Sequence, residues 1–255
     1  MKSVIYCFTG TGNSLTVAWK IAEELGNCEV LPMTSKHYEN TDFDNIGFVY
    51  PVYFQGIPLA VKEFVNGMKI HNKKAYFFAV ATYGGLAGNG TAQLKQLLSE
   101  KGVVLSYGSY LKMFSNYVVM YNMSKNVSSS IIKSDQDLER ILKEVTARKV
   151  RPVRKSLGIL EWYYKKREQA VPGMDKDYNI SEKCTGCGIC SKVCPVENIT
   201  MSENEPVFQH HCEQCMACIQ YCPKRALNYK NITQSRRRYT NPSVKVQDLM
   251  EFYSK

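Results

Sequence analysis

The sequence predicts an α/β fold: a five-stranded parallel sheet, doubly wound by helices, in residues 1–150, followed by a small cysteine-rich α+β domain. One observation is that strand-like runs of β-branched and aromatic residues alternate with amphipathic helical segments. Another is the continuous apolar run at 75–81, which is typical of a strand buried on both faces. A third is the group of eight cysteines between Cys184 and Cys222, in a segment too small to fold well without a metal.

The expected strands and helices alternate along the first part of the chain. Strands are expected at residues 2–8, 28–33, 46–52, 75–81 and 103–113, and helices at 15–25, 59–65 and 91–101. A further helix is expected to begin at Ser134, because acidic residues follow it and apolar residues then recur at helical spacing. Residues 114–133 are expected to form a loop packed on the core, or alternatively a lid over a cofactor or a domain interface.

Composition narrows the class of protein. No run of eighteen apolar residues exists, so no membrane span is expected. The N-terminal residues lack the apolar segment and cleavage site of a signal peptide, so a cytoplasmic location is expected. Clustered cysteines in a chain of this kind indicate metal binding or redox chemistry more than disulfides. Cys7 and Cys28, which lie outside the cluster, are expected to be buried apolar residues.

The clustered cysteines form an internal repeat. Each half has three cysteines three residues apart, a fourth cysteine four residues later, and then a proline, and every position recurs 28 residues further on. The halves contain Cys184, Cys187, Cys190 and Cys194, and then Cys212, Cys215, Cys218 and Cys222. Thiolates at this spacing let a short loop wrap an iron–sulfur cubane. Zinc, the alternative, usually takes two CxxC pairs separated by a longer span.

This segment resembles the bacterial ferredoxins that bind two 4Fe–4S clusters, across residues 174–230. The resemblance implies that the fourth cysteine of each half ligates the cluster of the other half. The first cluster would be held by Cys184, Cys187, Cys190 and Cys222, and the second by Cys212, Cys215, Cys218 and Cys194. His210 and His211 are expected to lie on the surface or just outside the ligands, because the eight ligand positions are already filled.

A Gly-rich loop, Thr9-Gly10-Thr11-Gly12-Asn13-Ser14, follows the first expected strand and precedes the first helix. Its backbone N–H groups could surround a phosphate at the helix N-terminus. The loop lacks the third glycine of a dinucleotide-binding motif and the lysine of a P-loop. No Lys or Arg lies between Val4 and Val17, so a phosphate would be held by neutral donors. No second nucleotide-binding motif is visible, so direct oxidation of NAD(P)H is not expected.

The loop resembles the phosphate loop of flavodoxins, which bind FMN, and two further loops fit that resemblance. They follow the third and fourth strands, at the edge where doubly wound sheets bind ligands. Glycines there let backbone approach a flat ring, and tyrosines can stack on it. A flavodoxin-like domain that has lost its cofactor is the alternative. The expected FMN-binding residues are Thr9, Gly10, Thr11, Gly12, Asn13, Ser14, Pro51, Val52, Tyr53, Phe54, Gln55, Gly56, Thr82, Tyr83, Gly84, Gly85, Gly88 and Asn89.

Positive charge is concentrated outside the two predicted domains. The net charge is +10; residues 146–170 carry 8 Lys/Arg against 2 Asp/Glu, and residues 231–255 carry 5 against 2. This distribution favours a redox partner with an acidic docking surface. The basic linker, 151–173, is expected to be a connector, with contact to a membrane surface or RNA as minor alternatives. One helical face of it could carry Leu157, Leu160, Tyr164 and Arg167.

The C-terminal tail, residues 231–255, carries no recognisable motif. Its run Arg236-Arg237-Arg238 is expected to be solvated or to form a docking patch. A short helix is expected near residues 244–252.

As a whole the chain resembles the flavodoxin–ferredoxin fusion proteins, which are found mainly in anaerobic bacteria and archaea. The resemblance implies an electron-transfer protein that passes electrons between two 4Fe–4S clusters and FMN, and on to a redox partner, with no catalytic acid or base. One alternative is a flavin-dependent reductase of a small molecule that uses the clusters as a conduit. Another is an iron–sulfur sensor, although nucleic acid is not an expected partner. A homodimer is left open.

Overall fold

In the computed structural model, which describes residues 1–39 and 43–255, five parallel strands form one sheet in the order β2-β1-β3-β4-β5. The strands are β1 (Ser3–Cys7), β2 (Cys28–Pro32), β3 (Asn45–Pro51), β4 (Tyr76–Tyr83) and β5 (Leu105–Lys112). The order reverses beside β1, and such sheets bind ligands at the carboxyl ends of the strands near that reversal. The predicted doubly wound α/β fold is confirmed.

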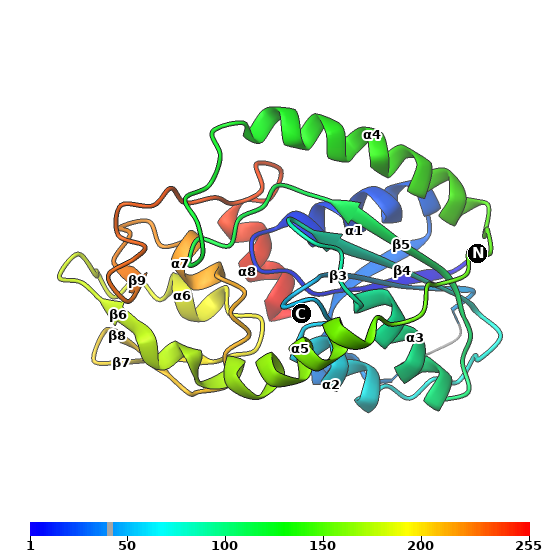
Figure 1. The fold of residues 1–255 in the computed structure, drawn as a ribbon, viewed down its shortest axis with the longest axis horizontal. Helices are drawn as coiled ribbons and strands as arrows, with labels where there is room; N and C mark the ends of the chain where they lie inside the picture. Colours follow the sequence, from blue (N-terminus) through cyan, green and yellow to red (C-terminus); the bar gives the residue numbers. More distant parts are fainter. Residues whose placement is uncertain (40–42) are drawn as a thin grey trace.

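Helices cover both faces of the sheet (Figure 1). One face carries α1 (Asn13–Leu25), α4 (Val127–Thr146) and α8 (Val246–Ser254), and the other carries α2 (Leu59–Gly67) and α3 (Gly90–Glu100). A single turn of 3₁₀ helix, η1 (Ser35–His37), follows β2. Phe77 and Phe78 of β4 are both fully buried but belong to different core clusters, because successive side chains of a strand point to opposite faces. No helix in the described ranges is long and apolar enough to cross a bilayer.

The start of α4 differs from the prediction at Ser134. The helix begins seven residues earlier, at Val127, so Ser134 lies inside it and residues 127–133 are helical. The Ser134 hydroxyl donates to the carbonyls of Ser130 and Lys112, at 2.7 and 2.8 Å. A serine that can bond to the carbonyl four residues earlier is tolerated within a helix, and here it also ties α4 to β5.

The two isolated cysteines differ in burial. Cys7 is fully buried in β1, as expected, whereas Cys28 is partly exposed. The expectation for Cys28 was wrong because β2 is an edge strand, paired with β1 on one side only.

The cysteine-rich segment folds as a small separate unit, here called the cysteine unit (residues 178–229). Its strands β6 (Tyr178–Ile180) and β9 (Leu227–Tyr229) pair antiparallel, and so do β7 (Ile199–Ser202) and β8 (Glu205–Phe208). Two one-turn helices, α6 (Ile189–Lys192) and α7 (Ala217–Gln220), contain the third cysteines of the two halves, Cys190 and Cys218. Pairing of β6 with β9 joins the two ends of the unit.

The linker forms α5 (Gly158–Ala170) and then the 3₁₀ segment η2 (Val171–Asp177). Of the expected helical face, Tyr164 docks on the sheet domain: its hydroxyl donates to the Ile57 carbonyl at 2.8 Å, and its ring packs on Gly56. A Cβ on Gly56 would lie 2.2 Å from that ring, so only glycine fits. Leu157 instead precedes α5 and is exposed.

The C-terminal tail returns to the sheet domain. In α8, Leu249 and Phe252 are buried in the same core as α1 and α4, so the cysteine unit is an insertion between α5 and α8 (Figure 1). The arginine run does not form a free patch. Arg236 donates to the carbonyls of Val118 and Val119, each at 2.8 Å, because the tail passes directly beside that loop. Arg237 and Arg238 also donate to backbone carbonyls, those of Ser124 and Leu227.

Candidate functional site

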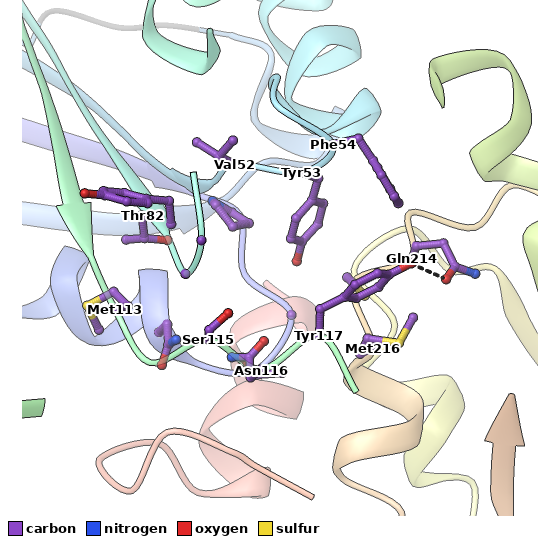
Figure 2. A pocket seen from close by; sticks show the side chains of 18 of the residues that line it. Val52, Tyr53, Phe54, Thr82, Met113, Ser115, Asn116, Tyr117, Gln214 and Met216 are labelled. Atoms are coloured by element: carbon purple, nitrogen blue, oxygen red, sulfur yellow. Dashed lines mark hydrogen bonds between the residues drawn. The ribbon is translucent and has the colours of Figure 1, made fainter. Parts of the chain in front are cut away.

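A cavity of about 250 Å³ lies at the carboxyl ends of β1, β3 and β4. Figure 2 shows Tyr53 projecting into it, with Thr82 and Met113 on one side and Gln214 and Met216 on the other. Among residues 1–39 and 43–255, none that lines it carries a charged side chain. The three loops predicted from the sequence contribute Thr9, Gly10, Thr11, Asn13, Ser14, Pro51, Val52, Tyr53, Phe54, Gln55, Thr82, Tyr83, Gly84 and Gly85.

The loop at residues 9–14 presents backbone donors to this cavity. Gly12 precedes α1 with φ of 92°, a left-handed conformation that glycine adopts without strain. The first amides of a helix have no partner within the helix, so those at the start of α1 remain available to an anion. The loop's polar side chains are occupied within the protein: the Thr9 and Thr11 hydroxyls accept from Gly12 N and from Asn116 Nδ2.

The turn at residues 53–56 is held in an unusual conformation. Tyr53 and Gly56 exchange backbone hydrogen bonds of 3.0 and 2.9 Å around Phe54 and Gln55, whose φ angles are 47° and 71°. Left-handed conformations cost side-chain-bearing residues of order 1 kcal/mol and persist mainly at functional sites. The Gln55 Oε1 atom is buried at this cavity and has no hydrogen-bond partner among the described residues. A bound ring carrying N–H groups would supply the missing donor.

Four residues predicted for the FMN site do not line the cavity: Gly12, Gly56, Gly88 and Asn89. Gly12 faces Val244 of the tail, where a Cβ would approach to 2.9 Å. Gly56 lies under α5, and Gly88 abuts the Gln55 backbone. Asn89 holds the start of α5 through two 3.0 Å bonds to the Leu157 backbone. These four residues hold the loops in shape through contacts outside the cavity.

Two smaller cavities in the cysteine unit are each lined by four cysteines. One contains Cys184, Cys187, Cys190 and Cys222, and the other contains Cys194, Cys212, Cys215 and Cys218. The fourth cysteine of each half therefore lies with the first three of the other half. We call the first group the distal set and the second group the proximal set, because the second lies nearer to the large cavity.

Backbone amides donate to cysteine sulfurs in both halves of the repeat. Asn198 N lies 3.2 Å from Cys194 Sγ, and Ala226 N, its counterpart 28 residues later, lies 3.3 Å from Cys222 Sγ. In the proximal set Gln214 N adds a 3.2 Å bond to Cys212 Sγ. Such donors stabilise the thiolate form that ligates iron, so the donor set fits iron–sulfur clusters.

The proximal set directly adjoins the large cavity, because Cys215 lines both. Gly10 is the point of closest approach. A Cβ there would lie 2.3 Å from the Cys215 carbonyl oxygen and 3.0 Å from Tyr53 Oη, so glycine alone allows the cysteine loop to rest on the Gly-rich loop.

Glu213 fixes this contact from the other side. It is 4% exposed, and its carboxylate accepts from the amides of Leu59 and Ala60, at 3.1 and 2.5 Å, at the start of α2. Burial raises the pKa of Glu213 to about 8, and the two amide donors limit that rise. One buried side chain thereby holds the cysteine loop on the sheet domain.

Two family models match the chain, in the two regions that the structure separates. A model described as a flavodoxin domain matches residues 4–104, and one described as a 4Fe–4S dicluster domain matches residues 176–223. The chain is a flavodoxin–ferredoxin fusion. It is therefore a redox protein of the flavin and iron–sulfur type, as the sequence predicted.

Solved structures similar to this fusion protein match its flavodoxin domain. A flavodoxin from the domain Archaea is 12% identical over 58% of this chain and 98% of its own, with a TM-score of 0.40. A mutant flavodoxin from Pseudomonas aeruginosa is 15% identical over 58% and 98%, with a TM-score of 0.40. An FMN-dependent NADH-azoreductase from Bacillus anthracis is 11% identical over 58% and 99%, with a TM-score of 0.41. No curated protein matches the chain.

Part of the cavity wall was not among the predicted site residues. The segment after β5 contributes Met113, Phe114, Ser115, Asn116, Tyr117, Met120 and Tyr121. Phe114 and Val118 of this segment are also buried against the cysteine unit. It therefore forms a wall between the two units as well as packing on a core, and its concentration of aromatic residues was the available signal.

Further wall residues come from the cysteine loop itself. Gln214 and Met216 lie between proximal cysteines and line the cavity, with the Tyr117 hydroxyl 3.4 Å from Gln214 Oε1 (Figure 2). Comparison of the two halves could have found them, because the first half has Gly186 and Gly188 at the matching positions.

The adjacent His210 and His211 precede Cys212 of the proximal set, and both contact other groups of the protein. His210 is exposed, and its Nδ1 lies 2.7 Å from the buried Asp175 carboxylate. His211 Nε2 lies 2.8 Å from the Val196 carbonyl. Neither histidine lines either cysteine cavity.

Proposed function

We propose that the protein carries electrons between two 4Fe–4S clusters and one FMN, and exchanges them with a redox partner. The observation that carries this proposal is that Cys215 lines both the proximal cavity and the large cavity. A cysteine that would ligate the cluster and also line the flavin cavity would leave only a short gap for an electron to cross between the two cofactors. FMN accepts one or two electrons and each cluster transfers one, so the pair couples single-electron steps to two-electron steps.

The proposed residues follow the lining of the three cavities. FMN would be held by the loops at 9–14, 51–55 and 82–85, with its phosphate on neutral backbone donors and its ring near Gln55 and Tyr53. The clusters would be held by the distal and proximal sets of cysteines. We propose residues 1–150 and 174–230 as the two domains, with α8 completing the first.

The order of the cofactors follows from exposure. In the proximal set Cys212 and Cys218 are buried, whereas in the distal set Cys187 is exposed and the other three cysteines are partly exposed. The distal cluster would therefore form the solvent-exposed end of the electron path, the proximal cluster would relay, and FMN would form the other end, beside the partner surface on α5.

A partner with an acidic surface would find unpaired cations on α5 and the residues before it. Arg154, Lys155, Lys165 and Lys166 are exposed and form no ion pair with any residue in 1–39 or 43–255. Ile159 and Trp162 are exposed beside them, at 76% and 58%, and the neighbouring Tyr163 lines the FMN cavity. An apolar centre with a charged rim is typical of protein docking sites. Like charges would repel the same face of a second copy, so this surface favours an acidic partner over a homodimer.

Anaerobic purification with quantified cofactors tests this function. The proposal predicts about eight iron atoms, about eight sulfides and one FMN per chain, all reduced and reoxidised reversibly. Reduced protein should pass electrons to redox proteins with acidic surfaces and should not turn over small-molecule acceptors at comparable rates. Rapid turnover of a small molecule at the flavin would replace the carrier with a flavin-dependent reductase. Absence of flavin and iron from protein prepared without air would refute both.

A further inference from the structure

Gln220 is a buried glutamine in α7, between Cys218 and Cys222. Both ends of its side-chain amide are occupied. Nε2 donates to the Asn116 carbonyl at 2.8 Å, and Oε1 accepts from the Tyr239 amide at 2.8 Å. One side chain of the cysteine unit thus holds two segments that lie far apart in the sequence, the loop after β5 and the C-terminal tail.

The loop after β5 contacts residues 9–14, which we call the phosphate loop, through Asn116. Its carbonyl is fixed by Gln220, and its own side-chain Nδ2 donates to the Thr11 hydroxyl at 2.8 Å. Asn116 and Thr11 both line the FMN cavity, as Figure 2 shows for Asn116. A contact at α7 is therefore two hydrogen bonds away from the phosphate loop.

The second segment reaches the same loop through Tyr239. Its backbone amide is fixed by Gln220, and its hydroxyl donates to Asn13 Oδ1 at 2.8 Å. The Tyr239 ring packs on Phe114 with centroids 4.6 Å apart, and Asn241 N donates to the Thr11 carbonyl at 2.8 Å. This path too ends on the phosphate loop, at the first residue of α1.

The consequence lies in how a phosphate would be bound here. No charged side chain in the part of the chain that the structure describes lines the cavity, so affinity for the phosphate depends on the direction of backbone N–H groups. Thr11 and Asn13 set that direction, and both are held through residues that Gln220 fixes. Buried hydrogen bonds that satisfy every member of a network rigidify it.

We propose that Gln220 is a positioning residue that links the cysteine unit to the phosphate loop, so that FMN binds tightly only when the cysteine unit is correctly folded around its clusters. The inference rests on the proposed function, because it concerns the same FMN site. Linkage is reciprocal: bound FMN should also slow the loss of iron from the cysteine unit.

Titration of flavin-free protein that retains its clusters tests the proposal. Gln220→Leu keeps the size of the side chain and removes both hydrogen bonds. We expect its dissociation constant for FMN to rise about tenfold with unchanged iron content, a change that corresponds to about 1.4 kcal/mol. The matched control is Gln209→Leu, an exposed glutamine of the same unit that bonds to Thr200 and Val207 and should leave the constant unchanged.

A double-mutant cycle with Tyr239→Phe separates positioning from general destabilisation. Tyr239→Phe alone should weaken FMN binding about threefold. The fold-loss of affinity in the double variant should be smaller than the product of the two single fold-losses, because both changes interrupt the path through Tyr239. Hydrogen exchange at amides 11–15 of flavin-free protein should accelerate in Gln220→Leu and not in Gln209→Leu. Fully multiplicative effects, or unchanged exchange, would overturn the proposal.

The outcomes also distinguish this proposal from the function on which it rests. If wild-type protein with intact clusters fails to bind FMN, the proposed function fails. If wild type binds FMN and Gln220→Leu binds it equally well with full iron content, only the role of Gln220 fails. If Gln220→Leu loses its iron, Tyr239→Phe becomes the deciding variant, because Tyr239 lies outside the cysteine unit. An unchanged dissociation constant for FMN in Tyr239→Phe then overturns the proposal.

Discussion

The two cysteine loops, residues 184–190 and 212–218, share a backbone and differ in the side chains between their cysteines. Gly186 and Gly188 have φ angles of 66° and 70°, and their counterparts Gln214 and Met216 have 53° and 66°. Glycine adopts this conformation freely, whereas a side chain there costs about 1–2 kcal/mol. The second loop therefore bears a strain that the first avoids. Gln214 and Met216 line the FMN cavity, so the strain occurs where the loop contacts the proposed flavin.

A further pair of matching positions shows the same difference. Thr185 is exposed, whereas its counterpart Glu213 is buried and accepts the amides of Leu59 and Ala60 at the start of α2. Identical ligand spacing thus serves a solvent-facing set in one half and a set packed on the flavodoxin domain in the other. The comparison teaches that the surroundings of each loop, and not its motif, would assign its place in the proposed electron path.

Removal of one ligand from each set should give the largest difference. Cys215→Ala and Cys187→Ala should each lose about half of the iron, because each removes a ligand from a different cluster. Cys215→Ala should also weaken FMN at least tenfold, and more than Cys187→Ala does, because Cys215 rests on the phosphate loop at Gly10. Iron analysis and FMN titration of both variants check this. Equal FMN affinities in the two variants would contradict the assignment of a proximal and a distal set.

Gly10→Ala should separate the two units without touching a cysteine. The added Cβ would lie 2.3 Å from the Cys215 carbonyl oxygen, so one loop must shift, at a cost of about 1–3 kcal/mol. FMN affinity should fall about tenfold, as measured by fluorescence titration. Gly158→Ala is the control, because nothing lies within 4 Å of its Cβ position and affinity should be unaffected.

Transfer of the first loop's glycines into the second should give a smaller effect. The double variant Gln214→Gly, Met216→Gly removes the backbone strain at two residues in the left-handed conformation and leaves the four proximal cysteines in place. Iron content should stay full, while FMN affinity falls about threefold because two cavity walls are lost. Loss of iron in this variant would mean that the side chains serve the cluster and not the flavin.

Neutralisation of α5 should give the smallest effect. Lys165→Gln with Lys166→Gln removes two unpaired cations near the FMN cavity, and should slow association with an acidic redox protein a few-fold at low salt. The difference should vanish at high salt, since exposed charges are screened. Stopped-flow mixing across a salt series measures it. The matched variant Lys69→Gln, in an exposed pair with Glu39, should not change the rate.

Much of the fold was predictable because strand and helix periodicity is local. The apolar run at 75–81 predicted a central strand, and β4 lies between β3 and β5. The start of α4 was not predictable in the same way. Ser134 resembles a helix cap in sequence, but its hydroxyl bonds to the Ser130 carbonyl within the helix and to Lys112 across the fold, and the second contact is not visible in the sequence.

The site was predictable where the residue types and spacing of a motif are specific to one kind of ligand. The resemblance of the repeat to bacterial ferredoxins implied which four cysteines lie together, and the same groups of four line the two small cavities. The contacts between units were not predictable, because they depend on how separate segments meet. Gln220 occupies a position that the cysteine motif leaves unspecified, and Tyr239 belongs to no motif. Arg236 looks like a surface charge in the sequence, and only the structure places the loop at Val118 beside it.

Flash reduction of the flavin, followed by the appearance of the electron on a cluster, tests the central claim most directly. The claim is that the proximal cluster exchanges electrons with FMN and the distal cluster does not. At saturating FMN, Cys187→Ala should retain the wild-type rate of flavin-to-cluster transfer within about twofold, and Cys215→Ala should slow it at least about a hundredfold. Loss of the transfer in Cys187→Ala together with its survival in Cys215→Ala would contradict the account.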